Sequence, residues 1–189
     1  MSRRHTISPA RAGIAGALAL AVLISGCGAD PNAGAQSTAD SITDAATWFP
    51  LEIGGVAFRA QLAIRPSEQR RGLMFREELG EDDGMLFVYS EPQPMGFWMR
   101  DTPLPIDLGF LSPDGVLDEV HGLIPFDETV VRSRSDRVQF ALEMNRGWFA
   151  RNGVRRGDRL DLDRLAEAIR LRGFNPAVYL DDSDPGLTD

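Results

Sequence analysis

Residues 48–64 read WFPLEIGGVAFRAQLAI, and this stretch decides what kind of fold the chain can adopt. Apolar side chains recur at every second position on both sides of Gly54-Gly55, first over 49–53 and then over 56–64. Such alternation is typical of β-strands with one buried face, and a Gly-Gly pair accepts the positive φ angles of a tight turn. The stretch therefore predicts a β-hairpin at the start of the folded part.

Short apolar runs bounded by turn residues continue this pattern along the chain. Strands are predicted at 85–89, 97–99, 106–111, 116–121, 138–144 and 159–162, and short helices at 68–74, 147–153 and 164–172, with Asp163 capping the last helix. Many short strands with two or three short helices predict a mainly-β domain, a compact sandwich or barrel-like fold.

The first 27 residues carry a different pattern. Residues 1–11 contain three arginines and no acid, and residues 12–24 form an uninterrupted run of 13 apolar or small residues. Because a membrane-spanning helix needs about 20 such residues, the pattern is typical of a secretory signal. The run ends in Ile24-Ser25-Gly26-Cys27, which resembles the lipobox of bacterial lipoproteins, and Cys27 is the expected site of lipidation. Gly28 favours the outer membrane, facing the periplasm, in a Gram-negative cell.

These patterns divide the chain into five segments. We expect a lipoprotein signal peptide at 1–26, a flexible tether at 27–47, a β domain at 48–162, a helical appendage at 163–180 and a disordered tail at 181–189.

The composition excludes several kinds of chemistry. The formal net charge of −8 argues against nucleic acid as a partner, because nucleic acids need a basic surface. The chain has no lysine, Cys27 is its one cysteine, and His121 is its one histidine after the expected signal peptide. A cysteine nucleophile, a disulfide scaffold, a Schiff base and a multi-histidine metal site are therefore excluded, and no cofactor is expected.

Six blocks of residues occur in a fixed order. They are RGLMFR at 71–76, GMLF at 84–87, FWMRDT at 97–102, PIDL at 105–108, ALEM at 141–144 followed by Gly147-Trp148, and Gly153-Val154 followed by Gly157-Asp158-Arg159. Together they resemble the DUF192 family, also called UPF0127, over about residues 50–162. Relatives more often have Lys-Asn where this chain has Arg100-Asp101. The resemblance implies a mainly-β fold and leaves the biochemical activity open, since none is established for the family.

Residues from these blocks form the candidate binding face. The candidate ligand-binding residues are Arg71, Trp98, Met99, Thr102, Asp107 and Glu143. They combine an apolar surface, carboxylates and a cation, which suits a small polar ligand or a peptide segment of an envelope protein. We therefore expect a lipid-anchored binding or accessory module rather than an enzyme.

Two other functions use some of the same residues. Asp107 with Glu143 or His121 could serve a hydrolase or a glycan-acting enzyme, but the pattern favours structural ion pairs of these carboxylates with Arg71 or Arg100. Met95 and Met99 could bind Cu(I), although methionines more often fill gaps in a core. His121 is interpreted as an exposed strand residue.

A cluster of arginines surrounds the first predicted helix. Its members are Arg65, Arg70, Arg71 and Arg76. They could form an anion site, but nearby glutamates favour local ion pairs instead.

Overall fold

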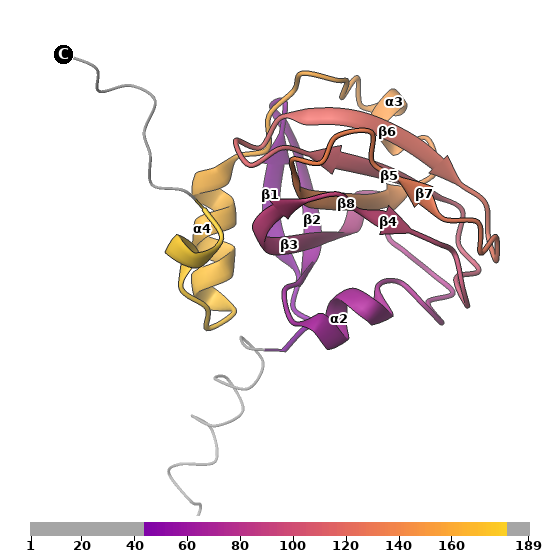
Figure 1. Ribbon diagram of the computed structural model, residues 1–189, viewed down its shortest axis with the longest axis horizontal. Helices are drawn as coiled ribbons and strands as arrows, with labels where there is room; N and C mark the ends of the chain where they lie inside the picture. The colour runs from indigo at the N-terminus through magenta and orange to yellow at the C-terminus, as the bar shows by residue number, and fades with distance from the viewer. Residues whose placement is uncertain (1–43, 181–189) are drawn as a thin grey trace, which may run out of the picture. The chain divides into compact units, whose positions relative to one another are not determined.

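The computed structural model describes residues 44–180, which all lie in one unit of the chain, Ala33–Asp189. In this range the chain forms eight strands, three short α-helices and one 3-10 helix (Figure 1). The strands are β1 (Phe49–Ile53), β2 (Val56–Ala63), β3 (Asp83–Gln93), β4 (Gly96–Phe97), β5 (Ile106–Leu111), β6 (Leu117–Leu123), β7 (Val131–Arg132) and β8 (Val138–Asn145). The helices are α2 (Pro66–Arg71), α3 (Trp148–Arg151), α4 (Leu162–Leu171) and the 3-10 helix η1 (Pro176–Val178). The mainly-β prediction is confirmed.

Six of the strands form one mixed sheet in the order β1-β2-β3-β8-β5-β6. Neighbouring strands are antiparallel except β2 and β3, which are parallel and are connected through α2. β4 and β7 form a separate two-stranded sheet. Within the described range the large sheet does not close into a barrel.

The predicted hairpin is present at the N-terminal edge of this sheet. β1 and β2 pair with Leu51 opposite Phe58, and both side chains are buried. Gly54 and Gly55 have φ angles of 58° and 82°, which only glycine adopts without strain. The Gly-Gly pair therefore sets the register of the hairpin.

The two faces of the sheet carry separate hydrophobic cores. β8 shows the division, because Phe140, Leu142 and Met144 belong to one cluster of buried residues and Ala141 belongs to the other. We call the cluster with Phe140 the first core and the cluster with Ala141 the second core. Glu143 alternates with Leu142 and Met144, so its side chain lies on the second-core face of β8.

α4 packs against the first core through Leu165, Ala168 and Ile169. Its N-cap is Asp161, whose Oδ1 accepts a hydrogen bond from the backbone N–H of Arg164 at 3.0 Å. The prediction that Asp163 caps this helix is therefore wrong by two residues. The helix begins at Leu162, ahead of Leu165 and Ile169, whose spacing indicated a helix in the sequence.

Other departures concern the shortest elements. The strand predicted at 159–162 is reduced to two isolated bridges, Val116 with Arg159 and Ile53 with Leu160. The strand predicted at 97–99 is β4, Gly96–Phe97. β7 was not predicted, because a two-residue strand carries no periodic signal.

A buried ion pair joins the end of α4 to α2. Arg172 is fully buried, and its guanidinium donates to the carbonyl of Leu62 at 3.1 Å and to Oε1 of Glu68 at 2.7 Å. Oε2 of Glu68 accepts the backbone N–H groups of Ile64 and Arg65, both at 2.9 Å. One glutamate thus caps α2 and also holds the C-terminal segment.

Candidate functional site

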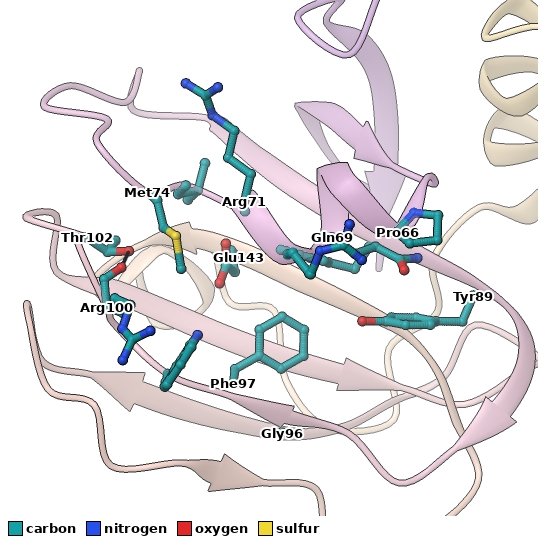
Figure 2. A pocket seen from close by; sticks show the side chains of 15 residues that line it. Pro66, Gln69, Arg71, Met74, Tyr89, Gly96, Phe97, Arg100, Thr102 and Glu143 are labelled. Carbon is teal, nitrogen blue, oxygen red and sulfur yellow. Dashed lines mark hydrogen bonds between the residues drawn. The ribbon is translucent and has the colours of Figure 1, made fainter.

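A cavity of about 560 Å³ opens on the second-core face of the sheet (Figure 2). α2 and the turn that follows it form one side, and β3, β8, β4 and the segment after β4 form the rest. The lining residues are Pro66, Gln69, Arg70, Arg71, Gly72, Leu73, Met74, Phe87, Tyr89, Gly96, Phe97, Trp98, Arg100, Thr102 and Glu143. Its volume lies in the range of small-molecule pockets, roughly 300–1,000 Å³.

Glu143 is a buried carboxylic acid in the wall of this cavity. The residue is 5% exposed, and its Oε2 has no hydrogen-bond partner among the described residues. Burial raises the pKa of Glu143 from 4.5 to about 8, because no nearby cation offsets the loss of water around the charge. The carboxyl group is therefore mostly protonated at neutral pH.

Aromatic side chains surround this acid. The rings of Phe87 and Phe97 meet edge to face with centroids 4.9 Å apart. Figure 2 shows the hydroxyl of Tyr89 and the carboxyl of Glu143 turned toward the same space. Burial, and secondly the charge of Glu143, raise the pKa of Tyr89, which therefore keeps its hydroxyl proton at neutral pH. The other polar side chains of the lining are Gln69, Thr102 and three arginines, and the remaining lining residues are apolar or glycine.

Arginines lie at the rim of the cavity. Arg100 pairs with Glu128 at 2.9 Å, and its Cζ lies 4.2 Å from the ring centroid of Trp98. Arg70 and Arg71 are exposed and form no ion pair within residues 44–180. The rim therefore carries positive charge that no described acid neutralises.

Gly72 brings the turn after α2 close to the buried acid. Its φ is +49°, and a Cβ atom there would lie 3.3 Å from Cζ of Phe87 and 3.9 Å from Oε2 of Glu143. Any side chain at this position would be strained and would enter the space above the carboxyl group. The glycine thus keeps the cavity open at its acidic end.

Three non-glycine residues that are adjacent in sequence or hydrogen-bonded to cavity-lining residues have left-handed backbone angles. Phe75, Asp101 and Phe126 have φ angles of 62°, 50° and 61°. The backbone N–H of Phe75 donates to the carbonyl of Asp101 at 2.7 Å, and that of Phe126 donates to the carbonyl of Thr102 at 3.2 Å. Strained backbone of this kind is often found at binding sites, and here it leaves Phe75 and Phe126 more than 60% exposed.

The structure brings together four of the six candidate binding residues. Arg71, Trp98, Thr102 and Glu143 all line the cavity. Met99 does not, because its side chain points into the second core and is 2% exposed. The structure therefore places Met99 in the core and not in the cavity wall.

Asp107 also lies outside this cavity. It pairs with Met144 across β5 and β8, whereas Glu143 pairs with Leu108, so the two carboxylates lie on opposite faces of the sheet. Oδ2 of Asp107 accepts the backbone N–H of Gly147 at 2.7 Å, and Oδ1 lies 3.4 Å from Arg146. A two-carboxylate enzyme built on Asp107 and Glu143 is not supported by this arrangement.

The expected ion pairs also differ from those observed. Asp107 pairs with Arg146 rather than with Arg71 or Arg100, and Glu143 has no ion pair within the described part of the chain. Of the arginine cluster around α2, Arg65 pairs with Glu68 at 2.9 Å. Arg76 donates to Oε1 of Gln61 at 2.6 Å.

His121 is half-buried and paired rather than exposed. Its Nε2 lies 2.8 Å from Oε2 of Glu119, whose Oε1 accepts the backbone N–H of Arg134 at 2.7 Å. Burial raises the pKa of Glu119, but the hydrogen bonds from Arg134 and His121 outweigh it and the pKa is lowered. These residues line a second cavity of about 430 Å³ together with Asp107, and Glu143 is not part of its lining.

The copper alternative needs accessible sulfur atoms. Met95 and Met99 are 4% and 2% exposed and belong to the second core. Among residues 44–180, no group of three histidine, cysteine or acidic residues is arranged to hold a metal ion. The structure therefore assigns these two methionines to packing.

Sequence reasoning missed Gly72, Gln69, Tyr89 and Phe97 as cavity residues. Gly72 follows Arg71 and Phe97 precedes Trp98 in the sequence blocks, so their position next to candidate binding residues could have indicated them as cavity residues. Tyr89 offered none, because it continues a strand whose preceding residues are all apolar.

Some expectations concern parts of the chain that the structure does not describe. Cys27, the signal peptide, most of the tether and the tail after residue 180 lie outside the described residues. Within residues 44–180, no helix has the length and hydropathy needed to cross a bilayer.

Fold and cavity together define a mainly-β domain with an aromatic pocket around a buried acid. The DUF192 family model, described as "Uncharacterized ACR", matches residues 49–162. The chain belongs to the DUF192 family.

Two solved structures resemble this domain. One is a protein of unknown function from Novosphingobium aromaticivorans DSM 12444, with 35% identity and a TM-score of 0.57 over 60% of this chain and 84% of the other. Another is described as a candidate transcription regulator from Sinorhizobium meliloti 1021, with 34% identity and a TM-score of 0.56 over 61% of this chain and 95% of the other. No curated protein matches this chain.

Proposed function

We propose that this protein is a lipid-anchored binding module of the bacterial envelope, and that the cavity around Glu143 holds a small polar ligand. The observation that carries the ligand site is the unpartnered Oε2 of Glu143 among the described residues. Leaving a buried polar atom without a partner costs about 1–3 kcal/mol, more for a charged group. A ligand that satisfies this atom recovers that energy.

The surroundings of Glu143 support binding rather than packing as its role. A buried acid kept only for stability would be expected to have a cation or several hydrogen-bond donors beside it. Glu143 has neither within residues 44–180, and it lines a cavity large enough for a small molecule. Aromatic walls add apolar contact area for such a ligand.

The remaining parts of the proposal rest on the sequence. The basic start, the short apolar run and Cys27 support export and lipidation, with the mature protein facing the periplasm from the outer membrane in a Gram-negative host. A role in transcription, as in the description of the Sinorhizobium protein, is disfavoured for this chain, because DNA binding needs a basic surface and the formal net charge is −8.

A screen of small polar compounds by saturation-transfer NMR tests the ligand site. We expect hits on the wild-type protein that disappear in Glu143→Leu, which replaces the acid by an apolar side chain of similar size. They should persist in Glu167→Gln, a change of an exposed acid on α4 that pairs with Arg170. A wild-type protein without hits, or hits that Glu143→Leu leaves unchanged in an equally folded protein, would contradict the proposal.

A further inference from the structure

The cavity lining offers a buried carboxyl group and an arginine side chain at two different places. Glu143 supplies the one acid of its lining, and its Oε2 lacks a donor within the described residues. Arg71 supplies a guanidinium that no described acid engages, while Glu68, the acid of α2, pairs with Arg65 and Arg172. Figure 2 shows the exposed side chain of Arg71 extended away from Glu143, so Arg71 must change its rotamer to reach a ligand in the cavity. A ligand that satisfies both groups must carry a donor at one end and an anion at the other.

The surroundings of Glu143 favour a cationic donor. An ammonium group has three N–H donors, enough for Oε2 of Glu143 and for the hydroxyl oxygen of Tyr89 on β3. The rings of Phe97 and Tyr89 also line this part of the cavity, and aromatic faces attract cations within about 6 Å. A neutral hydroxyl or amide would gain one hydrogen bond and none of this attraction.

Arg71 favours a carboxylate at the other end. A guanidinium binds a carboxylate with two parallel hydrogen bonds, which fixes its orientation as well as its charge. Arg100 is less available, because it is paired with Glu128 and stacked on Trp98. Arg70, beside Arg71 on α2, adds to the positive potential.

We propose that the ligand of this cavity is a small aminocarboxylate, such as an amino acid, whose ammonium group pairs with Glu143 and whose carboxylate pairs with Arg71. This inference rests on the proposed ligand site and adds the chemical class. Phe97 and Trp98, which also line the cavity, offer apolar surface to the ligand's side chain.

Ligand uptake then releases a proton. Glu143 is mostly protonated at neutral pH, and it must lose that proton to solvent before it can pair with an ammonium group. The other titratable and charged residues of the cavity lining are Tyr89 on β3, Arg70 and Arg71 on α2, and Arg100 after β4. The pKa of Tyr89 is raised by burial, so Tyr89 keeps its proton in this range and the released proton comes from Glu143.

Isothermal titration calorimetry with the purified full-length protein tests this inference. The probes are the twenty common L-amino acids and, for each one that binds, the amine that lacks its carboxylate and the acid that lacks its amino group. We expect at least one amino acid to bind more tightly than both of its analogues. Its affinity should rise about tenfold from pH 6 to pH 7, and about one proton should be released per ligand, measured in two buffers of different ionisation enthalpy.

Matched variants assign the two ends of the ligand. Glu143→Gln should weaken binding at least tenfold and remove the pH dependence. Arg71→Gln should reduce amino-acid binding to the level of the amine and leave amine binding unchanged. Glu167→Gln and Arg170→Gln, changes in an exposed ion pair on α4, are the controls. They should change neither the affinity for the amino acid nor the affinity for the amine.

The outcomes separate this inference from the proposed function. If the acids bind as tightly as the amino acids, or if Glu143→Gln binds equally well, the aminocarboxylate assignment is wrong. If no amino acid binds but other compounds bind in a Glu143-dependent manner, the cavity is a ligand site for another class. If no compound binds at all, both proposals are wrong.

Discussion

Glu143 links the stability of this domain to pH. Its pKa of about 8 in the folded protein lies above the ordinary value of 4.5, so between these values the folded state holds a proton that the unfolded state has lost. The contribution of Glu143 to the free energy of unfolding is therefore fully present below pH 4.5 and is lost as the pH rises toward 8. The loss is at most about 1.4 kcal/mol per pH unit.

Glu143→Gln should remove this dependence. We expect the variant to be more stable than the wild type at pH 9 and the difference to shrink toward pH 5, as measured by urea unfolding across that range. Glu78→Gln, a change of an exposed acid outside the cavity lining, should follow the wild-type profile. Parallel profiles for wild type and Glu143→Gln would show that the carboxyl is not protonated by burial.

Gly72→Ala should destabilise the domain by about 1 kcal/mol or more, because the positive φ strains alanine and its Cβ presses on Phe87. Gly153→Ala is the matched control, since Gly153 has a φ of +71° but a Cβ atom there would meet no other atom within 4 Å. Denaturant midpoints compare the two. Equal losses would mean that the contact with Phe87 contributes nothing.

At the scale of elements, two neighbouring acids at the start of α4 have different roles, since Asp161 is the N-cap and Asp163 lies in the first turn. Asp161→Ala should cost about 0.5–2 kcal/mol because the N–H of Arg164 loses its acceptor, whereas Asp161→Asn should retain most of the stability. Asp163→Ala removes an acid from the first turn without removing the cap and should cost less than half as much. Thermal unfolding of the three variants gives the order, and a larger loss for Asp163→Ala would contradict the assignment.

The longer strands could be predicted from the sequence because each contains enough residues for its pattern of apolar positions to be recognised. β1, β2, β5 and β8 each bury alternating or continuous apolar positions, and their predicted ranges agree with the structure to within a few residues. β4, β7 and the bridges at 159–160 depend on tertiary contacts with distant segments, and local sequence does not encode those contacts.

The candidate site was predictable in part for a related reason. Glu143, Trp98 and Arg71 stood out by residue type in distinct sequence blocks. The face on which Asp107 lies depends on the register between β5 and β8, and a shift of one residue would have turned its side chain to the opposite face. No pattern within either strand determines that register.

At the scale of the whole molecule, the proposed lipid anchor makes Cys27 the residue that we expect to hold the protein at the membrane. Cells grown with radiolabelled palmitate should label the wild-type protein and not Cys27→Ala, and the variant should leave the membrane fraction, because a single acylated residue is the proposed anchor. His121→Ala, a change in the folded domain, should label normally. An unlabelled wild-type protein, or membrane-bound Cys27→Ala, would contradict the anchor.

Arg172 extends the set of residues that fold together beyond the part of the chain that the family model matches. The match ends at residue 162, yet the guanidinium ten residues further on is the buried partner of Glu68, and Glu68 in turn caps the helix above the cavity. A chain shortened to the matched boundary would leave that glutamate without its cation and would uncover the apolar surface beneath α4. The ten residues after the family match are therefore part of what keeps the wall of the cavity in place.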